Sequence, residues 1–236
     1  RNCGYGGLPP AARLDLETIL SHKEALPVLL DLLRGPSPEG RVYAAEALLL
    51  HHVRVRQGEV SVGQRVRAVV DAEHRLRVAR SHTATHLLHW ALRKVLGPET
   101  VQAGSLVEAE RVRFDFSALR RLEEEQQARV ERFVNERIRA ADQGNANVMK
   151  LEDAKRAGAL ALFGEKYGQQ VRVVSIGDYS RELCGGTPLV HTGSIGLFRI
   201  AAESSIAAGT RRIEAVVGEA AEERQRQDSR LLDEAA

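Results

Sequence analysis

Apolar residues recur at two different spacings along the chain, and the spacing changes near residue 50. Over residues 1–50 leucines fall three or four positions apart, which is the spacing of helices that bury one face. Over residues 51–70 apolar and polar residues alternate, as in a half-buried antiparallel hairpin. We therefore expect a helical segment of unknown role over residues 1–50, followed by a β-hairpin over residues 51–70.

The helical spacing returns after residue 70 in a segment with clear ends. Asp71 is suited to cap the N-terminus of a helix, because its carboxylate can accept a backbone N–H of the first turn. Gly97 and Pro98 are suited to end the helix, and we expect an interruption near Ser81. The pattern therefore predicts helical structure between Asp71 and Gly97 with a break inside it.

The rest of the chain mixes short strands with amphipathic helices. We expect two strands between residues 101 and 116, and further strands at 171–176, 196–201 and 211–217. We expect helices at 118–140 and near 151–161, and an exposed helix over residues 218–236. The helix at 118–140 should turn these side chains inward: Leu119, Leu122, Val130, Phe133, Val134 and Ile138. Helices and antiparallel strands without strict alternation indicate the α+β class, with one domain over residues 71–217.

Length and composition permit one large domain or two small ones. With 236 residues and 43% hydrophobic content, the chain can bury a sizeable core. Lys and Arg number 34 against 32 Asp and Glu, so the net charge of +2 does not by itself indicate a nucleic-acid-binding protein. Two distant cysteines make no disulfide framework, and no apolar run is long enough to span a membrane. We expect a monomeric protein of the reducing cytoplasm.

Three residues of the types that bind zinc stand at informative positions. His82 and His86 are four residues apart, so a helix places both imidazoles on one face. Together with the Cys184 thiolate they would suit Zn²⁺. The alternative is that the histidines are hydrogen-bonded core residues and that the cysteine packs as a small hydrophobic side chain. We expect His89, one turn further along and next to two leucines, to be a packing residue.

Two glycines follow the cysteine directly. Gly185 and Gly186 let the backbone approach a ligand closely and can present N–H groups to a developing oxyanion. An oxyanion contact from this backbone is our hypothesis for a hydrolytic site.

Several strings in this part of the chain carry a family resemblance. They are RSHTATHLLH at 80–89, QAGSLV at 102–107, RFDFS at 113–117, ALFGEKY at 161–167, ELCGGT at 182–187, GLFRI at 196–200 and GTRRIE at 209–214. With these strings, residues 53–217 resemble the editing domain of alanyl-tRNA synthetase and its free-standing relatives. This is the second additional domain family of threonyl and alanyl-tRNA synthetases.

The resemblance implies a fold, an activity and a cofactor. It implies a two-layer editing domain with antiparallel strands and a metal-site helix, which hydrolyses the ester between tRNA(Ala) and a wrongly attached serine or glycine. It also implies that zinc is held by His82, His86 and Cys184, and that Thr85 and Gln102 line the aminoacyl pocket. Thr85 would then bond the serine hydroxyl, and the alternative for this residue is a hydrogen bond to its own helix backbone.

The chain departs from the family at two places. The family's fourth ligand is a histidine, and it falls on Pro188, which has no side-chain donor. Either water completes the zinc site or His191 substitutes as a ligand; otherwise His191 is an exposed loop residue. The family's small β-barrel normally begins upstream, so the hairpin at 51–70 resembles only a remnant of it.

The partner implied by the resemblance is tRNA(Ala). We expect its phosphates to be contacted by Arg54, Arg56, Arg113, Lys166, Arg211 and Arg212. Two other functions are open on the sequence alone. One is a tRNA-binding module that lost catalysis together with its fourth ligand, and the other is a zinc-free hydrolase in which His82 or His86 is the general base.

Overall fold

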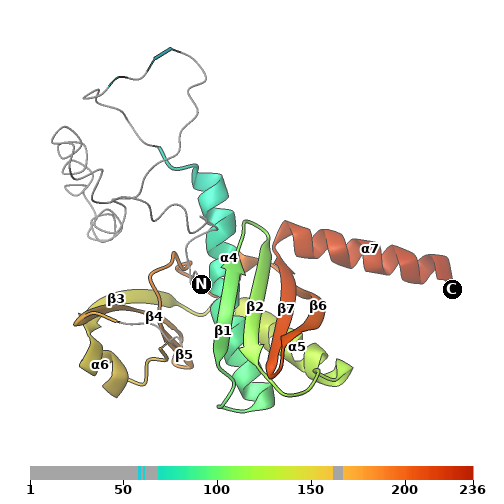
Figure 1. Ribbon diagram of the computed structural model, residues 1–236. Coiled ribbons are helices and arrows are strands. Elements are labelled where there is room, and N and C mark those ends of the chain that lie inside the picture. Colours follow the sequence, from blue (N-terminus) through green and yellow to red (C-terminus); the bar gives the residue numbers. More distant parts are fainter. Residues whose placement is uncertain (1–57, 60, 62–68, 162–166, 236) are drawn as a thin grey trace. The chain divides into compact units, whose positions relative to one another are not determined.

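The computed structural model describes residues 58–59, 61, 69–161 and 167–235, and the part from Asp71 onward forms one compact unit (Figure 1). The helical segment expected over residues 1–50 lies outside the described residues, as does most of the hairpin expected over 51–70. The unit combines helices with antiparallel strands, so the predicted α+β class is confirmed.

Helix α4 (Ala72–Leu96) is the central helix of this unit, and both of its predicted ends are confirmed. The Asp71 side chain accepts the backbone N–H of His74 at 2.9 Å, and Gly97 ends the helix with a φ of 114°. The interruption expected near Ser81 is wrong, because the helix is continuous. Residues 81–89 are all buried, and the Thr85 hydroxyl donates to the carbonyl of Ser81 within the helix. Packing on every side thus holds a segment that polar residues would otherwise weaken.

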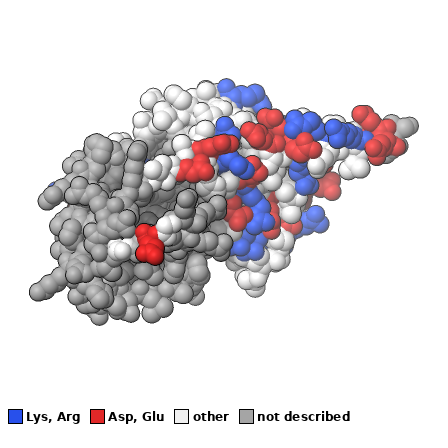
Figure 2. All heavy atoms as spheres, turned by 90° about the horizontal axis from the view of Figure 1, so that it is seen from above, with Lys and Arg blue, Asp and Glu red and all other residues white. Residues whose placement is uncertain are grey.

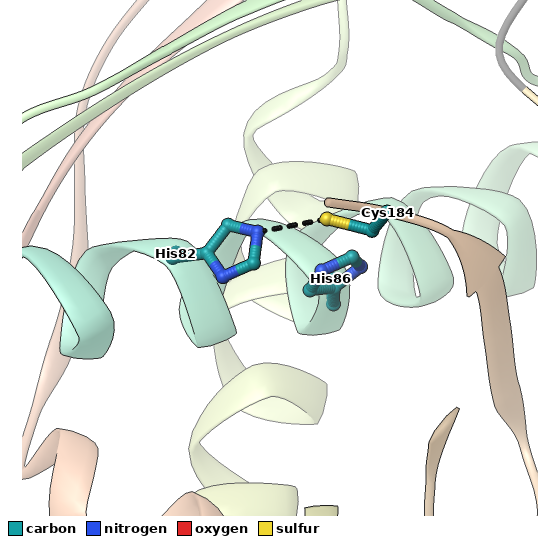
Figure 3. Close-up of side chains that lie close together, drawn as sticks. All are labelled: His82, His86 and Cys184. Atoms are coloured by element: carbon teal, nitrogen blue, oxygen red, sulfur yellow. Dashed lines mark hydrogen bonds between the residues drawn. The ribbon is translucent and has the colours of Figure 1, made fainter. Parts of the chain in front are cut away.

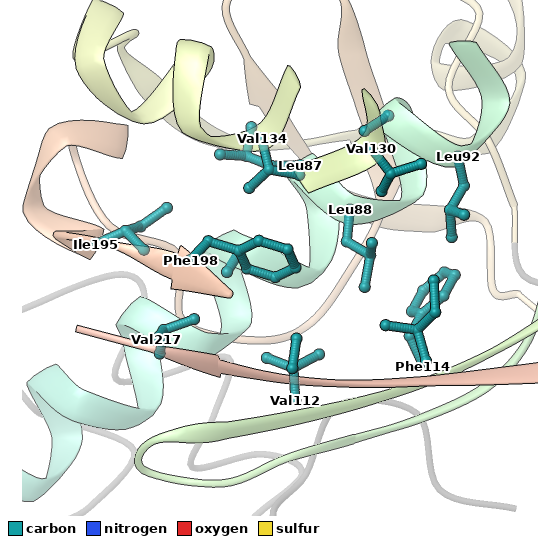
Figure 4. Close-up of a cluster of buried hydrophobic side chains, with 14 of the residues drawn as sticks. Leu87, Leu88, Leu92, Val112, Phe114, Val130, Val134, Ile195, Phe198 and Val217 are labelled. Carbon is teal, nitrogen blue, oxygen red and sulfur yellow. The ribbon is translucent and has the colours of Figure 1, made fainter. Parts of the chain in front are cut away.

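A four-stranded antiparallel sheet packs against α4. Its order is β1 (Gln102–Val107), β2 (Arg111–Ser117), β7 (Thr210–Val217) and β6 (Phe198–Ala207), which confirms the strands predicted in these regions. Helices α4 and α5 (Glu124–Ala140) cover one face of the sheet, so sheet and helices form two layers (Figure 1). The core between the layers contains Leu87, Leu88, Leu92, Val112, Phe114, Val130, Val134 and Phe198 (Figure 4).

Helix α5 begins later than predicted. It starts at Glu124 instead of residue 118, with a capping box between Glu123 and Gln126. Leu119, expected to face inward, precedes the helix and is 94% exposed, so that prediction is wrong. Val130, Val134 and Ile138 are buried as expected, Leu122 is buried ahead of the helix, and Phe133 packs partly buried against the core.

Polar side chains of α5 also protect one end of the edge strand β6. The Asn135 amide donates to the carbonyl of Phe198 at 2.8 Å and accepts its N–H at 3.1 Å. The carboxylate of Glu131 accepts the N–H of Ile200 at 2.7 Å. These bonds satisfy backbone groups that an edge strand would otherwise leave open.

A second, three-stranded sheet follows in the order β3 (Gly144–Lys150), β4 (Gln170–Ile176) and β5 (Ser180–Leu183). Only β4 was predicted; β3 is largely exposed and polar, and β5 has only four residues, so neither shows a clear apolar alternation. Helix α6 (Leu151–Arg156) is shorter than expected. It packs on this sheet around a small core of Ala154, Val171, Val173 and Leu183.

Helix α7 (Glu219–Ala235) confirms the exposed helix expected after residue 217. Basic and acidic side chains alternate along it (Figure 2), and Arg226 forms ion pairs with Glu222 and Glu223. Among the described helices, none is long and apolar enough to cross a membrane.

Candidate metal centre

Helix α4 supplies two buried imidazoles to the candidate site. His82 and His86 are 5% and 4% exposed, and their ring centroids lie 4.8 Å apart at an interplanar angle of 76°. Both side chains project from the same side of the helix toward Cys184 (Figure 3). The four-residue spacing thus has the geometric effect expected from the sequence.

Strand β5 brings the sulfur to this helix. Side chains alternate along a strand, so Leu183 enters the small core of the second sheet while Glu182 and Cys184 face α4. Cys184 Sγ lies 3.0 Å from His82 Nε2 (Figure 3). The potential ligand atoms of His82, His86 and Cys184 all lie within 4.8 Å of one another.

A buried carboxylate orients the second histidine. Glu182 Oε2 accepts the Nδ1–H of His86 at 2.9 Å, and Glu182 Oε1 accepts the Nδ1–H of His89 at the same distance. Metal-binding histidines usually donate their second ring N–H in this way, which fixes the tautomer and the ring orientation. Sequence reasoning missed this role of Glu182. His89 is buried as expected, but it also has this polar contact, which was not predicted.

The charges of the cluster shift three pKa values. Burial lowers the pKa of His86, but the charges of Glu182 and Cys184 outweigh it and raise the pKa to about 10. Burial would raise the pKa of Glu182, yet the charge of His86 and the hydrogen bonds from His86 and His89 hold this pKa well below the usual range. Burial likewise opposes the Cys184 thiolate, yet His82 and His86 hold its pKa well below the ordinary value. These shifts favour a Cys184 thiolate beside a His86 imidazolium in the protein without metal.

The donor set fits a zinc ion by an independent criterion. His86 Nε2 is buried and makes no hydrogen bond of regular geometry, although it interacts with the Cys184 sulfur and its Nδ1 is bonded to Glu182. A buried ring nitrogen without a partner is costly unless something else binds it. In the part of the chain that the structure describes, His82, His86 and Cys184 form the group that could hold an ion.

His191, the predicted substitute ligand, does not belong to this group of ligand atoms. Its side chain is exposed, and its backbone forms an isolated bridge with Gln143. Pro188 lies in the loop after Cys184, where Leu189 donates its N–H to the Thr83 hydroxyl at 2.8 Å. Among the described residues, His82, His86 and Cys184 are therefore the three side chains that could hold an ion here.

The two predicted pocket residues, Thr85 and Gln102, are both buried or nearly so. Thr85 is buried, and its hydroxyl donates to the Ser81 carbonyl at 2.9 Å, which is the backbone bond considered as its alternative role. Gln102 is 9% exposed, and its amide donates to the Ser105 hydroxyl at 3.0 Å. The hydroxyl oxygen of Thr85 retains the capacity to accept a hydrogen bond.

The two glycines differ in their surroundings. Gly185 is exposed, whereas Gly186 is buried and donates its N–H to Cys184 Sγ at 3.3 Å. A Cβ atom at position 186 would lie 2.4 Å from His82 Nε2, so a larger residue does not fit without movement. The Gly186 N–H, expected to face an oxyanion, is thus directed at the sulfur.

The predicted phosphate contacts are only partly within the described residues. Arg54, Arg56 and Lys166 lie outside them. Arg211 forms two bonds with Glu203 at 2.5 and 2.7 Å, and Arg212 forms two with Asp115 at 2.6 and 2.8 Å. These two guanidinium groups therefore stabilise the sheet internally, and a phosphate would have to compete with a carboxylate for them. Arg113 has a buried Nε without a hydrogen-bond partner.

Comparison with known proteins shows which family this chain resembles. Residues 171–214 match the threonyl and alanyl tRNA synthetase second additional domain. Alanine-tRNA ligases from Bacillus cytotoxicus and Bacillus thuringiensis (strain Al Hakam) are 52% and 51% identical over 187 residues, covering 79% of this chain and 21% of each relative. The alanine-tRNA ligase of Halalkalibacterium halodurans is 52% identical over 172 residues, covering 73% of the chain and 20% of the relative. The chain therefore spans about a fifth of the length of these curated relatives.

Proposed function

Because the chain belongs to the threonyl and alanyl tRNA synthetase second additional domain family, we propose that it hydrolyses mischarged tRNA(Ala) and releases the wrongly attached serine or glycine. It would do so as part of an alanyl-tRNA synthetase-like protein, in the cytoplasm and with zinc as cofactor. The convergence of His82, His86 and Cys184 is the observation that carries this proposal.

Physical limits on amino-acid selection explain why such a site is needed. A pocket that accepts alanine cannot exclude glycine, which is smaller. It also rejects serine poorly, because serine differs from alanine only by a hydroxyl. A second site with the opposite preference can remove these errors after they occur. That site must recognise the serine hydroxyl and leave correctly attached alanine in place.

Thr85 is our candidate for recognising serine. Its O–H is already used by the Ser81 carbonyl, so its oxygen is left to accept the hydroxyl proton of a substrate serine. Alanine offers no such proton, and a buried polar group left without its partner costs about 1–3 kcal/mol. Thr85 directly precedes His86 in a buried part of helix α4, so its position is tied to that of the proposed ligand.

The ligand residues prepare the site for hydrolysis. His82, His86 and Cys184 would hold zinc, with Pro188 leaving the fourth position open to water or substrate. Bound zinc would supply Lewis-acid polarisation of the ester or activation of a water. Glu182 keeps the His86 ring in the tautomer that presents Nε2 to the ion. The surrounding burial excludes bulk water from the histidines.

Replacing Thr85 by Val tests the recognition step. Valine keeps the shape but lacks the accepting oxygen, so we expect hydrolysis of serine-charged tRNA(Ala) to fall about 5- to 150-fold, as for a loss of about 1–3 kcal/mol. Thr85→Ser keeps the hydroxyl and is the matched control. Deacylation rates of serine-charged and alanine-charged tRNA(Ala) measure the effect. Unchanged serine removal by the Val variant would contradict the role of Thr85.

Pro188 favours a second candidate function, a module that binds tRNA without hydrolysing it. The family's fourth ligand position is occupied by Pro188, which is expected to weaken zinc binding. Catalysis, which depends on zinc, would then be lost while the tRNA-binding surface is retained. Retained tRNA binding without turnover in a zinc-supplied sample would support this candidate over the first.

A further inference from the structure

The loop that carries Cys184 is held by one arginine of the neighbouring strand. Arg172 lies on β4, and its Nη1 donates to the carbonyl of Cys184 at 3.0 Å and to the carbonyl of Gly186 at 2.8 Å. The backbone carbonyl of Arg172 also accepts the N–H of Cys184 at 3.0 Å. A single residue thus forms three hydrogen bonds with a loop of three residues.

These bonds act on the part of the loop that sets the position of the sulfur. The two carbonyls lie on either side of Gly185, so the guanidinium closes Cys184, Gly185 and Gly186 into a tight bend. Within that bend the Gly186 N–H is directed at Cys184 Sγ. Its α-carbon packs so close to the His82 ring that a Cβ atom would lie 2.4 Å from Nε2. Little displacement of the loop toward α4 is therefore possible.

The sulfur and the two histidines belong to different elements, so non-covalent contacts must hold Cys184 against helix α4. Strand β5 ends at Leu183, and its pairing with β4 continues only through the N–H of Cys184, which donates to the Arg172 carbonyl. Bonds from a guanidinium are charge-assisted and stronger than those between neutral groups, and the planar group has defined donor directions. The Arg172 side chain thus holds the carbonyls of Cys184 and Gly186, beyond the point where the backbone pairing with β4 ends.

We propose that Arg172 is the positioning residue of the metal centre, which holds the bend at Cys184–Gly186 so that Sγ faces the His82 and His86 imidazoles. The inference rests on the part of the proposed function that makes this cluster a metal site. It assigns Arg172 no contact with substrate. Its effect is transmitted through backbone bonds to a ligand.

Binding of Co²⁺ to the full chain tests this role, because a thiolate ligand gives Co²⁺ a near-ultraviolet charge-transfer band. Arg172→Met removes the charge and both side-chain bonds, and we expect about 10–100-fold weaker Co²⁺ and Zn²⁺ binding with a weakened thiolate band. Arg172→Lys retains a charged donor and should recover part of the affinity. Partial recovery by lysine distinguishes positioning by a cation from general packing.

Arg181→Met is the matched control. Arg181 lies on β5 of the same sheet and donates to the backbone carbonyl of Ala157, away from the cluster. This variant should bind Co²⁺ as the wild type does, and circular dichroism should report native folds for all variants.

If Arg172→Met does not fold, the comparison of Arg172→Lys with the wild type decides, with weaker binding than wild type expected. Wild-type affinity and an unchanged thiolate band in the folded Arg172 variants would overturn the inference, as would a wild-type chain that binds no Co²⁺.

Deacylation of serine-charged tRNA(Ala) is measured separately on the same samples. A wild-type chain that binds metal but does not hydrolyse the ester would contradict the proposed function. Weakened metal binding by Arg172→Met in that sample would still support the positioning role.

Discussion

The carboxylate of Glu182 receives the Nδ1–H groups of two imidazoles, those of His86 and His89. All three side chains are buried, so neither histidine can turn to solvent for a replacement partner. The geometry of the candidate metal centre therefore depends on a residue that is not itself a candidate ligand. Its charge is also the main attraction that favours the protonated form of His86.

Replacing Glu182 by Gln should weaken zinc binding about 10–100-fold, as is typical when an outer partner of a metal ligand is lost. The neutral amide can accept only one of the two N–H groups with its oxygen, so the His86 ring loses its fixed orientation. Competition with a chromophoric chelator measures the affinity. Glu152→Gln on α6, at an exposed position, is the matched control. Equal zinc affinity for the Glu182 variant and this control would contradict the role of Glu182.

Protons should compete with zinc at His86. A raised pKa, about 10, means that the imidazole is protonated at pH 7 in the metal-free protein, and Nε2 must lose its proton to bind the ion. The lowered pKa of Cys184 favours its thiolate, so we expect the released proton to come mainly from His86. We therefore expect release of about one proton from this pair on zinc binding at pH 7, with affinity rising as pH rises toward 10.

Isothermal titration calorimetry in buffers of different ionisation enthalpy counts the released protons. If zinc binding releases a second proton in the wild type but not in Cys184→Ala, the thiol is protonated before binding, which would contradict the prediction for Cys184. Affinity that does not change between pH 6 and 9 would contradict a protonated His86.

At the scale of elements, α4 combines local signals with tertiary support. Asp71 is its N-cap, and replacing it by Ala should reduce the free energy of unfolding by about 0.5–2 kcal/mol. Asp71→Asn keeps an accepting oxygen and should be close to wild type. Urea unfolding followed by circular dichroism measures both. Equal stability of the Ala and Asn variants would show that the cap does not stabilise the helix.

The elements that sequence reasoning predicted are those whose signals are local. The ends of α4 follow from a capping carboxylate and a glycine, and β4, β6 and β7 follow from apolar strand patterns. The start of α5 was missed because periodic spacing alone placed Leu119 on its inner face. Strands β3 and β5 carry few apolar residues and exist through pairing with β4, which no local pattern reveals.

The candidate site also combines features that are visible in the sequence with features that appear only in the folded structure. The spacing of His82 and His86 is a local property of a helix, and Cys184 was placed with them by family resemblance. The contacts of Glu182 join residues 96 and 93 positions apart in sequence, so only the folded arrangement of β5 against α4 shows them. The internal pairing of Arg211 and Arg212 with carboxylates was likewise not evident from their basic character.

At the scale of the whole molecule, the site joins the two sheets of the compact unit through one helix. Helix α4 packs on the four-stranded sheet and also presents His82 and His86 to the end of β5 in the three-stranded sheet. A metal bound to all three ligands would link these parts, so its removal should affect stability as well as chemistry.

The most direct test of the account is hydrolysis of serine-charged tRNA(Ala) by the full chain before chelation, after chelation and after zinc is added back, with alanine-charged tRNA(Ala) as control. We predict selective loss of serine that the chelator abolishes and zinc restores, with no restoration in Cys184→Ala. Turnover that survives chelation would point to a zinc-free hydrolase with a histidine base. Absence of turnover in a folded, zinc-loaded sample would contradict the proposed hydrolase.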